Sequence, residues 1–319
     1  MRSRRRQRGI ALVTAVLIVA IAVAVAAQIS FAHQLWFRQM ENVQDRGATD
    51  WLRRGALHWA SVALIEDAAQ GKSDHLGERW AMGLPTLPVE GGSIRASITD
   101  AQSRFNLNSV WGNDSASAAN LQMLQRLLEL LKLDPLLANA LVDWIDPDSE
   151  ARAGGAEDID YLILNPPYRA ANRLLASVDE LRLVRGFDAK TTAALLPYVT
   201  VLPVVTNNIN VNTAPPEVLA ALVPGLDLAA AGAIAQGRDG HPIADLPDFQ
   251  KRLPQGAGMP KNGASVGSDY FLVTLDTSIG RYQRRSEALL ARTNGGKSTS
   301  IVWERAQALI ASADDDQSQ

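Results

Sequence analysis

The sequence lacks cysteine and has only four histidines among its 319 residues. An oxidising compartment is compatible with this composition, but no disulfide bond can stabilise the fold. No two histidines have the spacing of metal ligands on one helix. They are His33, His58, His75 and His241.

Positive charge is scarce beyond the first nine residues. Those nine hold five arginines, and the rest of the chain carries 26 basic against 34 acidic residues, a net charge of −8. An acidic chain is a poor partner for a phosphate backbone, so nucleic acid is not the expected ligand. A hard cation is compatible with this charge. The hydrophobic share of 47% is enough for a sizeable core, which we expect in two lobes.

Two catalytic motifs occur, but neither has the surroundings it needs. Residues 263–267 match G-x-S-x-G, yet they precede an expected strand, whereas a nucleophile elbow follows a strand and opens a helix. Residues 296–298 read Gly-Lys-Ser, but Ala291 stands where a phosphate-binding loop has its first glycine. We therefore predict that the chain is not an enzyme.

The longest apolar run is Ile10 to Ala27, 18 residues without a charge. As a helix it would span about 27 Å, close to one hydrocarbon core. The arginines before it predict that the N-terminus stays in the cytoplasm and that the rest of the chain crosses the membrane.

Three interpretations of this run compete. It could be a secretory signal cut after the small residues 24–26, an anchor that is never cut, or a prepilin-type leader cut between Gly9 and Ile10. The third is favoured because a glycine separates the basic leader from the apolar run. Apolar residues also recur at helical spacing well beyond the membrane, which a disposable signal does not need.

The helix is expected to run from Ile10 to Ala69, and residues 71–73 are typical of a helix end. Residues 76–92, with their glycines and prolines, predict a loop. Residues 93–99 alternate between polar and apolar, as in a half-buried strand. Further strands are expected at 270–275, 284–292 and 299–303, with turns at 280 and 294–296. Everything between the first strand and its late partners would then be inserted into the sheet.

The inserted segment is predicted to be helical. Residues 120–133 are amphipathic, and Pro135 opens a second helix that extends through Trp144. Residues 177–187 and 214–226 each predict a helix, a glycine turn and a second helix, a unit that resembles the helix-hairpin-helix of many DNA-binding proteins. In an acidic chain we favour a packing role for these units.

Seven carboxylates crowd into residues 143–160. Asp146, Asp148, Glu150 and Glu157 fall at positions 1, 3, 5 and 12 of a calcium-binding loop. Ala151 replaces the usual glycine at position 6, so this is not an ordinary EF-hand. A solvated acidic loop is the alternative. We predict calcium, held by Asp146, Asp148 and Glu157, with Asp158 as a further ligand.

Several sequence blocks together resemble one family, the K-type minor pseudopilins of the bacterial type II secretion system (general secretion pathway protein K). The blocks are Gly9-Ile10-Ala11-Leu12, Arg104-Phe105-Asn106-Leu107-Asn108, residues 141–148, Gly155-Ala156-Glu157-Asp158 with Tyr161, residues 168–172, residues 177–181, residues 197–201 and residues 210–215. The match covers nearly the whole chain.

The resemblance implies an α+β, pilin-like fold, with a long N-terminal helix packed on an antiparallel sheet and a large all-α domain inserted into that sheet. The corresponding division is a leader (1–9), a transmembrane and assembly helix (10–69), a pilin-like domain (70–104 and 266–305), an inserted helical domain (105–265) and a flexible acidic tail (306–319).

The resemblance also implies a function in protein export. Thr14, at position five after the cut, replaces the glutamate of most pilin-like subunits, as in the K-type family. This favours a place at the tip of a periplasmic pseudopilus, where the subunit initiates or caps assembly. Implied partners are I- and J-type and also H-type minor pseudopilins, the inner-membrane assembly platform, and the prepilin peptidase that cleaves and methylates the N-terminus. The family is similar in binding calcium.

Two alternatives remain. One is a helix-hairpin-helix nucleic-acid-binding module of a DNA-uptake system. The other is a cleaved, soluble periplasmic binding protein or hydrolase. The favoured location is a single pass through the inner membrane, with the N-terminus in the cytoplasm and the bulk of the chain in the periplasm.

Overall fold

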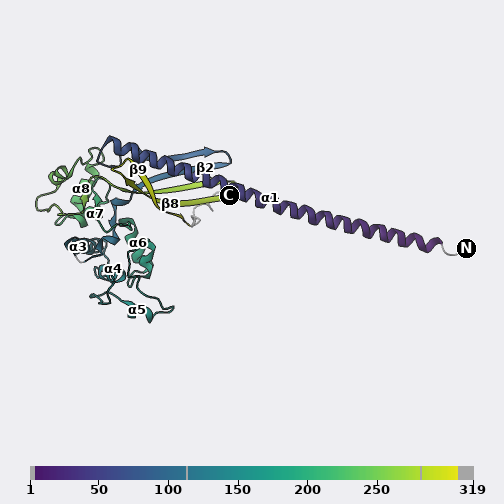
Figure 1. The fold of residues 1–319 in the computed structure, drawn as a ribbon, viewed down its shortest axis with the longest axis horizontal. Helices are drawn as coiled ribbons and strands as arrows, with labels where there is room; N and C mark the ends of the chain where they lie inside the picture. The colour runs from purple at the N-terminus through teal and green to yellow at the C-terminus, as the bar shows by residue number, and fades with distance from the viewer. Residues whose placement is uncertain (1–3, 113, 281, 308–319) are drawn as a thin grey trace.

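The computed structural model describes residues 4–112, 114–280 and 282–307. Part of the predicted leader and almost all of the predicted acidic tail therefore lie outside the described residues. A single long helix projects from a mixed α/β head, with the N-terminus at its far end (Figure 1).

The projecting helix, α1, runs from Arg4 to Gln70, so it begins within the predicted leader and ends one residue beyond the predicted Ala69. At 1.5 Å per residue, its 67 residues extend about 100 Å. Among the described residues, α1 alone is long and apolar enough to cross a membrane, and the most apolar part of it is not buried against the rest of the chain. The C-terminal part packs on the head through Ala56, Leu57, Ala60 and Leu64, which share one helical face.

The sheet has five antiparallel strands in the order β1-β2-β7-β8-β9. Their bounds are β1 Leu84–Val89, β2 Gly92–Asp100, β7 Tyr270–Ile279, β8 Tyr282–Thr293 and β9 Ser298–Gln307. Alternate residues of β2 and β7 point toward α1 and form a buried core with it. Each strand predicted from the sequence lies within one of these strands.

The prediction of a loop at residues 76–92 was wrong. This segment forms a short helix, α2 (Arg79–Met82), and strand β1. The prolines of this segment indicated a loop, but they are compatible with a strand here because β1 lies at the edge of the sheet. At an edge, a missing N–H removes no hydrogen bond from the sheet interior. Pro85 lies in the irregular part of the β1–β2 pairing. Trp80 of α2 is buried in the core, with its ring centroid 5.2 Å from that of Phe271.

The segment between β2 and its neighbour β7 lies outside the five-stranded sheet and has a core of its own. It is mostly helical, with two pairs of two-residue parallel strands. Its α-helices are α3 Ser115–Leu130, α4 Leu137–Ile145, α5 Asp158–Leu162, α6 Ala189–Leu195, α7 Pro216–Leu222, α8 Leu228–Gly237 and α9 Leu246–Arg252. The short strands are β3 Phe105–Asn106 with β4 Val199–Thr200, and β5 Ile209–Asn210 with β6 Ala264–Ser265. Its described residues also form the 3₁₀ helices η1 Ala101–Ser103, η2 Leu107–Val110, η3 Val178–Leu183 and η4 Leu196–Tyr198. The α+β fold class is confirmed. The inserted domain, however, is not purely α-helical as expected, because it contains these two short strand pairs.

The two predicted hairpin units form, although the first helix of the first unit is the 3₁₀ helix η3. Their turns use Gly186 and Gly225, both at positive φ. Each turn packs against another segment of the same chain: a Cβ on Gly225 would lie 2.9 Å from the Gly256 carbonyl oxygen, and one on Gly186 would meet the Leu137 side chain. These contacts favour the packing role over a nucleic-acid-binding role.

Candidate functional site

The acidic segment predicted to bind calcium connects two helices of the inserted domain. Asp146 directly follows α4, and Glu157 is the N-cap residue of α5. With Asp148 from the intervening loop, they place one carboxylate oxygen each within 4.8 Å of one another. The structure thus brings together three of the four predicted ligands.

The fourth predicted ligand, Asp158, lies outside this group. Its Oδ1 accepts the N–H of Ala170 at 3.0 Å, and its Oδ2 lies 3.6 Å from Arg169. Glu150 is also outside the group and exposed, although its N–H donates to Asp148 Oδ1 at 2.9 Å. The loop is therefore not an EF-hand, because its fifth-position carboxylate is not among the converging oxygens.

Burial makes this group of carboxylates chemically unusual. Asp146 and Glu157 are buried, whereas Asp148 is exposed. Burial raises the pKa of Glu157 to about 7, and the nearby carboxylates of Asp143, Asp146 and Asp148 add to the shift. Burial likewise raises the pKa of Asp146. Asp146 Oδ1 and Glu157 Oε1 are buried and have no hydrogen-bond partner among the described residues, so each has lone pairs free for a cation.

Arg152 and Asp143 hold the α4–α5 loop through hydrogen bonds and an ion pair. Asp143, which is fully buried, accepts from the Arg152 guanidinium at 2.9 Å and from the Arg152 backbone N–H at 3.0 Å. The same guanidinium contacts Asp146 Oδ2 at 2.5 Å. Gly155 is required here, because a Cβ at this position would lie 1.8 Å from Asp143 Oδ2. Sequence reasoning counted Asp143 among the carboxylates and Gly155 among the family blocks, but it gave Arg152 no role.

The residues present fit a hard divalent cation. The Arg152 guanidinium contacts Asp143 and Asp146, whereas Asp148 and Glu157 lie close to these two carboxylates, so the group as a whole is negatively charged. The buried oxygens of Asp146 and Glu157 that lack a partner have the chemistry and the placement of calcium ligands. Asp148 would contribute its oxygen from the solvent side.

The predicted cleavage and membrane residues lie on α1. Gly9 and Ile10 are both within the helix. The Thr14 hydroxyl lies 3.1 Å from the Ile10 carbonyl oxygen and 3.0 Å from that of Ala11, so its hydrogen is donated within its own helix. Ser265, the central residue of the G-x-S-x-G match, lies in β6 and donates to the Gly267 carbonyl oxygen at 2.7 Å. This is not the turn between a strand and a helix that a nucleophile needs.

Comparisons with known proteins identify relatives that match most of the chain. The family models described as Type II secretion system (T2SS), protein K match residues 103–204 and 209–267. Type II secretion system protein K of Klebsiella pneumoniae is 36% identical over 302 residues, covering 88% of this chain and 92% of the relative. Its counterpart in Pseudomonas aeruginosa is 35% identical over 309 residues, covering 92% of this chain and 91% of the relative.

A solved structure extends the likeness to three dimensions. The chain matched in the crystal structure of the GspK-GspI-GspJ complex from enterotoxigenic Escherichia coli has a TM-score of 0.70 and is 26% identical, covering 85% of this chain and 99% of that one. The likeness therefore includes both the pilin-like body and the inserted domain. On these matches, the chain belongs to the protein K family of the type II secretion system.

Proposed function

We propose that this pseudopilin stands at the tip of a periplasmic pseudopilus, where it initiates or caps the assembly of the fibre for protein export. The observation that carries the proposal is the combination of Thr14 in the membrane helix with a large domain inserted into the head. The first feature affects how the subunit joins others in the membrane, and the second affects what can be added beyond it.

The membrane step follows from the chemistry of position five. A carboxylate within the membrane costs about 2.5–3.5 kcal/mol unless it is paired. A glutamate there is retained when it neutralises the free N-terminal amine of a neighbouring subunit. Thr14 has no charge, and its hydroxyl hydrogen bonds to its own helix. The subunit is therefore poorly suited to joining beneath an existing subunit and well suited to being the first.

The inserted domain supplies the second restriction. It branches from the sheet at the β2–β7 boundary and extends beside the end of α1 that is distant from the N-terminus (Figure 1). A further subunit added on the head side would collide with this domain. The fibre can therefore grow only by addition of subunits on the membrane side.

The exposed apolar surface of α1 supports anchoring and lateral contact with other helices. Ile10, Leu17 and Trp36 are among its exposed residues. We infer a single pass through the inner membrane, with the arginine-rich end in the cytoplasm. The partners are the I- and J-type minor pseudopilins, whose E. coli counterparts crystallised together with the matched GspK chain, and an H-type subunit. The inner-membrane assembly platform is a further partner.

Processing by the prepilin peptidase, with methylation of the new N-terminus, is part of this function. Mass spectrometry of the native protein should find Ile10 at the N-terminus. A mature N-terminus at Ala27 or Gln28 would instead identify a secreted protein that has lost its anchor. Gly9→Leu should leave the leader attached.

Calcium at Asp146, Asp148 and Glu157 is the proposed ligand of the inserted domain. Bound calcium would neutralise the loop and join the end of α4 to the start of α5. A chelator should lower the melting temperature of the full chain in detergent micelles. Glu157→Gln should remove the response, and the matched control Glu150→Gln should retain it. An unchanged melting temperature after chelation of the wild type would refute the proposal.

The tip location can be tested by direct labelling. The natural sequence has no cysteine, so Lys190→Cys on the exposed surface of α6 creates a unique thiol. Pseudopili from cells that overproduce the major pseudopilin are then treated with maleimide-coated gold, with the wild-type chain as background. Label at one end of each fibre supports the proposal, and label along the shaft contradicts it.

A further inference from the structure

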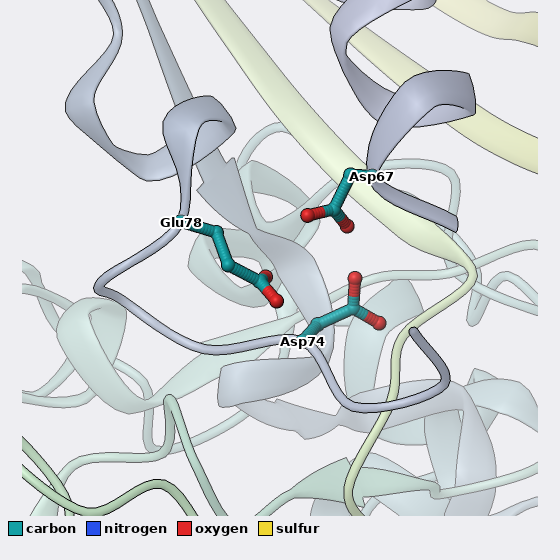
Figure 2. Close-up of side chains that lie close together, drawn as sticks. All are labelled: Asp67, Asp74 and Glu78. Atoms are coloured by element: carbon teal, nitrogen blue, oxygen red, sulfur yellow. The ribbon is translucent and has the colours of Figure 1, made fainter. Parts of the chain in front are cut away.

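A second group of carboxylates lies where α1 meets the rest of the head. Asp67 comes from the last turns of α1, Asp74 from the linker that follows, and Glu78 from the residue before α2. One oxygen from each lies within 4.8 Å of the others. Figure 2 shows the three side chains directed toward a common centre from separate segments.

This group already contains a cation. The guanidinium of Arg292, on β8, lies 2.6 Å from Asp67 Oδ2 and 2.5 Å from Asp74 Oδ1. Only 6% of the Arg292 side chain is exposed, and its Cζ lies 4.5 Å from the centroid of the Phe271 ring. A metal ion would have to displace this guanidinium, so we do not assign a metal to the group.

The Arg292 guanidinium contacts two carboxylates, those of Asp67 and Asp74, so its single charge does not balance both. The third carboxylate, Glu78, has its Oε1 3.4 Å from His75 Nε2. Glu78 is supported by two donors, the backbone N–H of His75 at 3.0 Å and the indole Nε1 of Trp80 at 2.7 Å. The two aspartates instead share Arg292. Other charged or titratable residues that line the same hollow are Glu66 with Arg79, Lys72 and His75, and Asp100 lies behind Ser268.

A buried carboxylate (Asp74) and a half-buried one (Asp67) on one guanidinium are most stable when they share a proton. Burial raises the pKa of Asp74 to about 6, and it also raises the pKa of Asp67. Both shifts favour protonation in mildly acidic solution. The proton would lie between the two aspartates and leave one negative charge for Arg292.

Asp74 also connects this group to the inserted domain. The N–H of Ser268 donates to Asp74 Oδ2 at 2.7 Å, and the Asn210 side-chain amide donates to the Asp74 carbonyl at 2.9 Å. The Ser268 hydroxyl and the Asn210 amide also both donate to the buried carboxylate of Asp100, which ends β2. One hydrogen-bond network thus joins α1, the sheet and both chain crossings into the inserted domain.

The apolar contacts at the same junction are few. The buried cluster there contains Ala101, Leu202 and Leu289, whereas the inserted domain and the pilin-like body each have much larger cores. The orientation of the inserted domain therefore depends strongly on the polar network, and its strength depends on the charge held at Asp67 and Asp74.

We propose that Asp67, Asp74 and Arg292 form a proton-dependent latch that fixes the inserted domain against the pilin-like body. The latch holds when the aspartates share one proton, and it weakens when both are ionised, because a second negative charge then enters a buried site. The latch is separate from the proposed calcium site, which lies in the α4–α5 loop of the inserted domain and shares no residue with it.

Spin-label distances test this latch in the full chain, held in nanodiscs with excess calcium. Lys190→Cys on α6 and Gln283→Cys on β8 place one label on each side of the junction, on exposed residues. The distance distribution should be narrow at pH 5 and broader at pH 8. Asp74→Asn, which imitates the protonated aspartate, should keep the narrow distribution at both pH values.

The control is Asp50→Asn. Asp50 also lies on α1 and contacts an arginine of β8, Arg284, at 3.4 Å, but it is about half exposed. This variant should broaden between pH 5 and pH 8 as the wild type does. Equal broadening of wild type and Asp74→Asn, or a wild-type distribution that does not change, would overturn the proposal.

Unfolding equilibria and an NMR titration give two further measurements, and the NMR titration serves even if Asp74→Asn does not fold. A pKa that rises from 3.8 to about 6 on folding means that the folded chain holds a proton that the unfolded chain releases. The wild-type unfolding constant should therefore rise about 100-fold more than that of Asp74→Asn between pH 4 and pH 7. In the wild type alone, a carboxyl-carbon NMR titration should place the Asp74 midpoint near pH 6. A midpoint near its ordinary value, about 4, would overturn the latch.

Discussion

Gly155→Ala is a severe test of the proposed calcium loop. The added methyl would lie 1.8 Å from Asp143 Oδ2, far inside van der Waals contact, and the neighbouring atom belongs to a buried, short side chain. Asp143 would have to move away, which breaks its ion pair with Arg152 at 2.9 Å and the backbone bond at 3.0 Å.

The magnitude follows from the burial of Asp143, whose side chain is fully buried, whereas that of its partner Arg152 is 33% exposed. Breaking a buried ion pair costs about 3–5 kcal/mol, because it leaves an uncompensated charge. For a domain of 150–250 residues, 1 kcal/mol lowers the melting temperature by about 2–4 °C, so we expect a loss of about 6–20 °C in the inserted domain. Asp143 and Asp146 share the Arg152 guanidinium, so a displaced Asp143 should also disturb Asp146. Calcium should therefore stabilise this variant less than the wild type.

The assay is thermal unfolding of the full chain in micelles, followed by circular dichroism with calcium and with chelator. Hydrogen exchange at residues 143–158 shows whether the loss of stability is located in this loop. The matched control is Gly232→Ala in α8, where an added Cβ meets no atom within 4 Å, and alanine in a helix should be neutral or stabilising. A Gly155→Ala melting temperature within about 1 °C of the wild type would refute the packing described for this loop.

Three further outcomes are expected. Without calcium, the wild type should lose stability as the pH rises from about 4.5 to 7, because the pKa of Glu157 is raised to about 7 in the folded chain; Glu157→Gln should lack this part of the pH dependence in denaturant titrations. Trp80→Ala should cost about 3–5 kcal/mol, because it empties a fully buried site beside Phe271; an equal loss in exposed Trp51→Ala would contradict this. Binding to duplex DNA at physiological salt should be undetectable in a fluorescence anisotropy titration, and tight, salt-sensitive binding would revive the nucleic-acid alternative.

The parts of the fold that depend on local sequence were predicted well. The membrane helix follows from an uninterrupted apolar run, and four of the five sheet strands follow from alternation or from bounded apolar segments. Strand β1 was missed because its prolines are acceptable only at a sheet edge, and edge position is a property of the assembled sheet.

For the site, the sequence predicted that hard oxygen ligands are concentrated in one loop, but not which of them converge. Asp146, Asp148 and Glu157 meet because α4 and α5 end and begin at fixed points around that loop, whereas Asp158 is held by the Ala170 N–H. Spacing along the chain cannot separate these cases, because neighbouring residues point in different directions once helix ends are set.

The sequence by itself determined that this chain has one helix long and apolar enough to span a membrane and a separate helical segment, since charge, apolar length and periodicity are local quantities. Only the tertiary structure decided that Arg292 would lie between Asp67 and Asp74, more than 200 residues away along the chain. Such a contact depends on the order of strands in the sheet and on where the inserted domain leaves and rejoins it. The burial that shifts the protonation of these aspartates arises from the same packing.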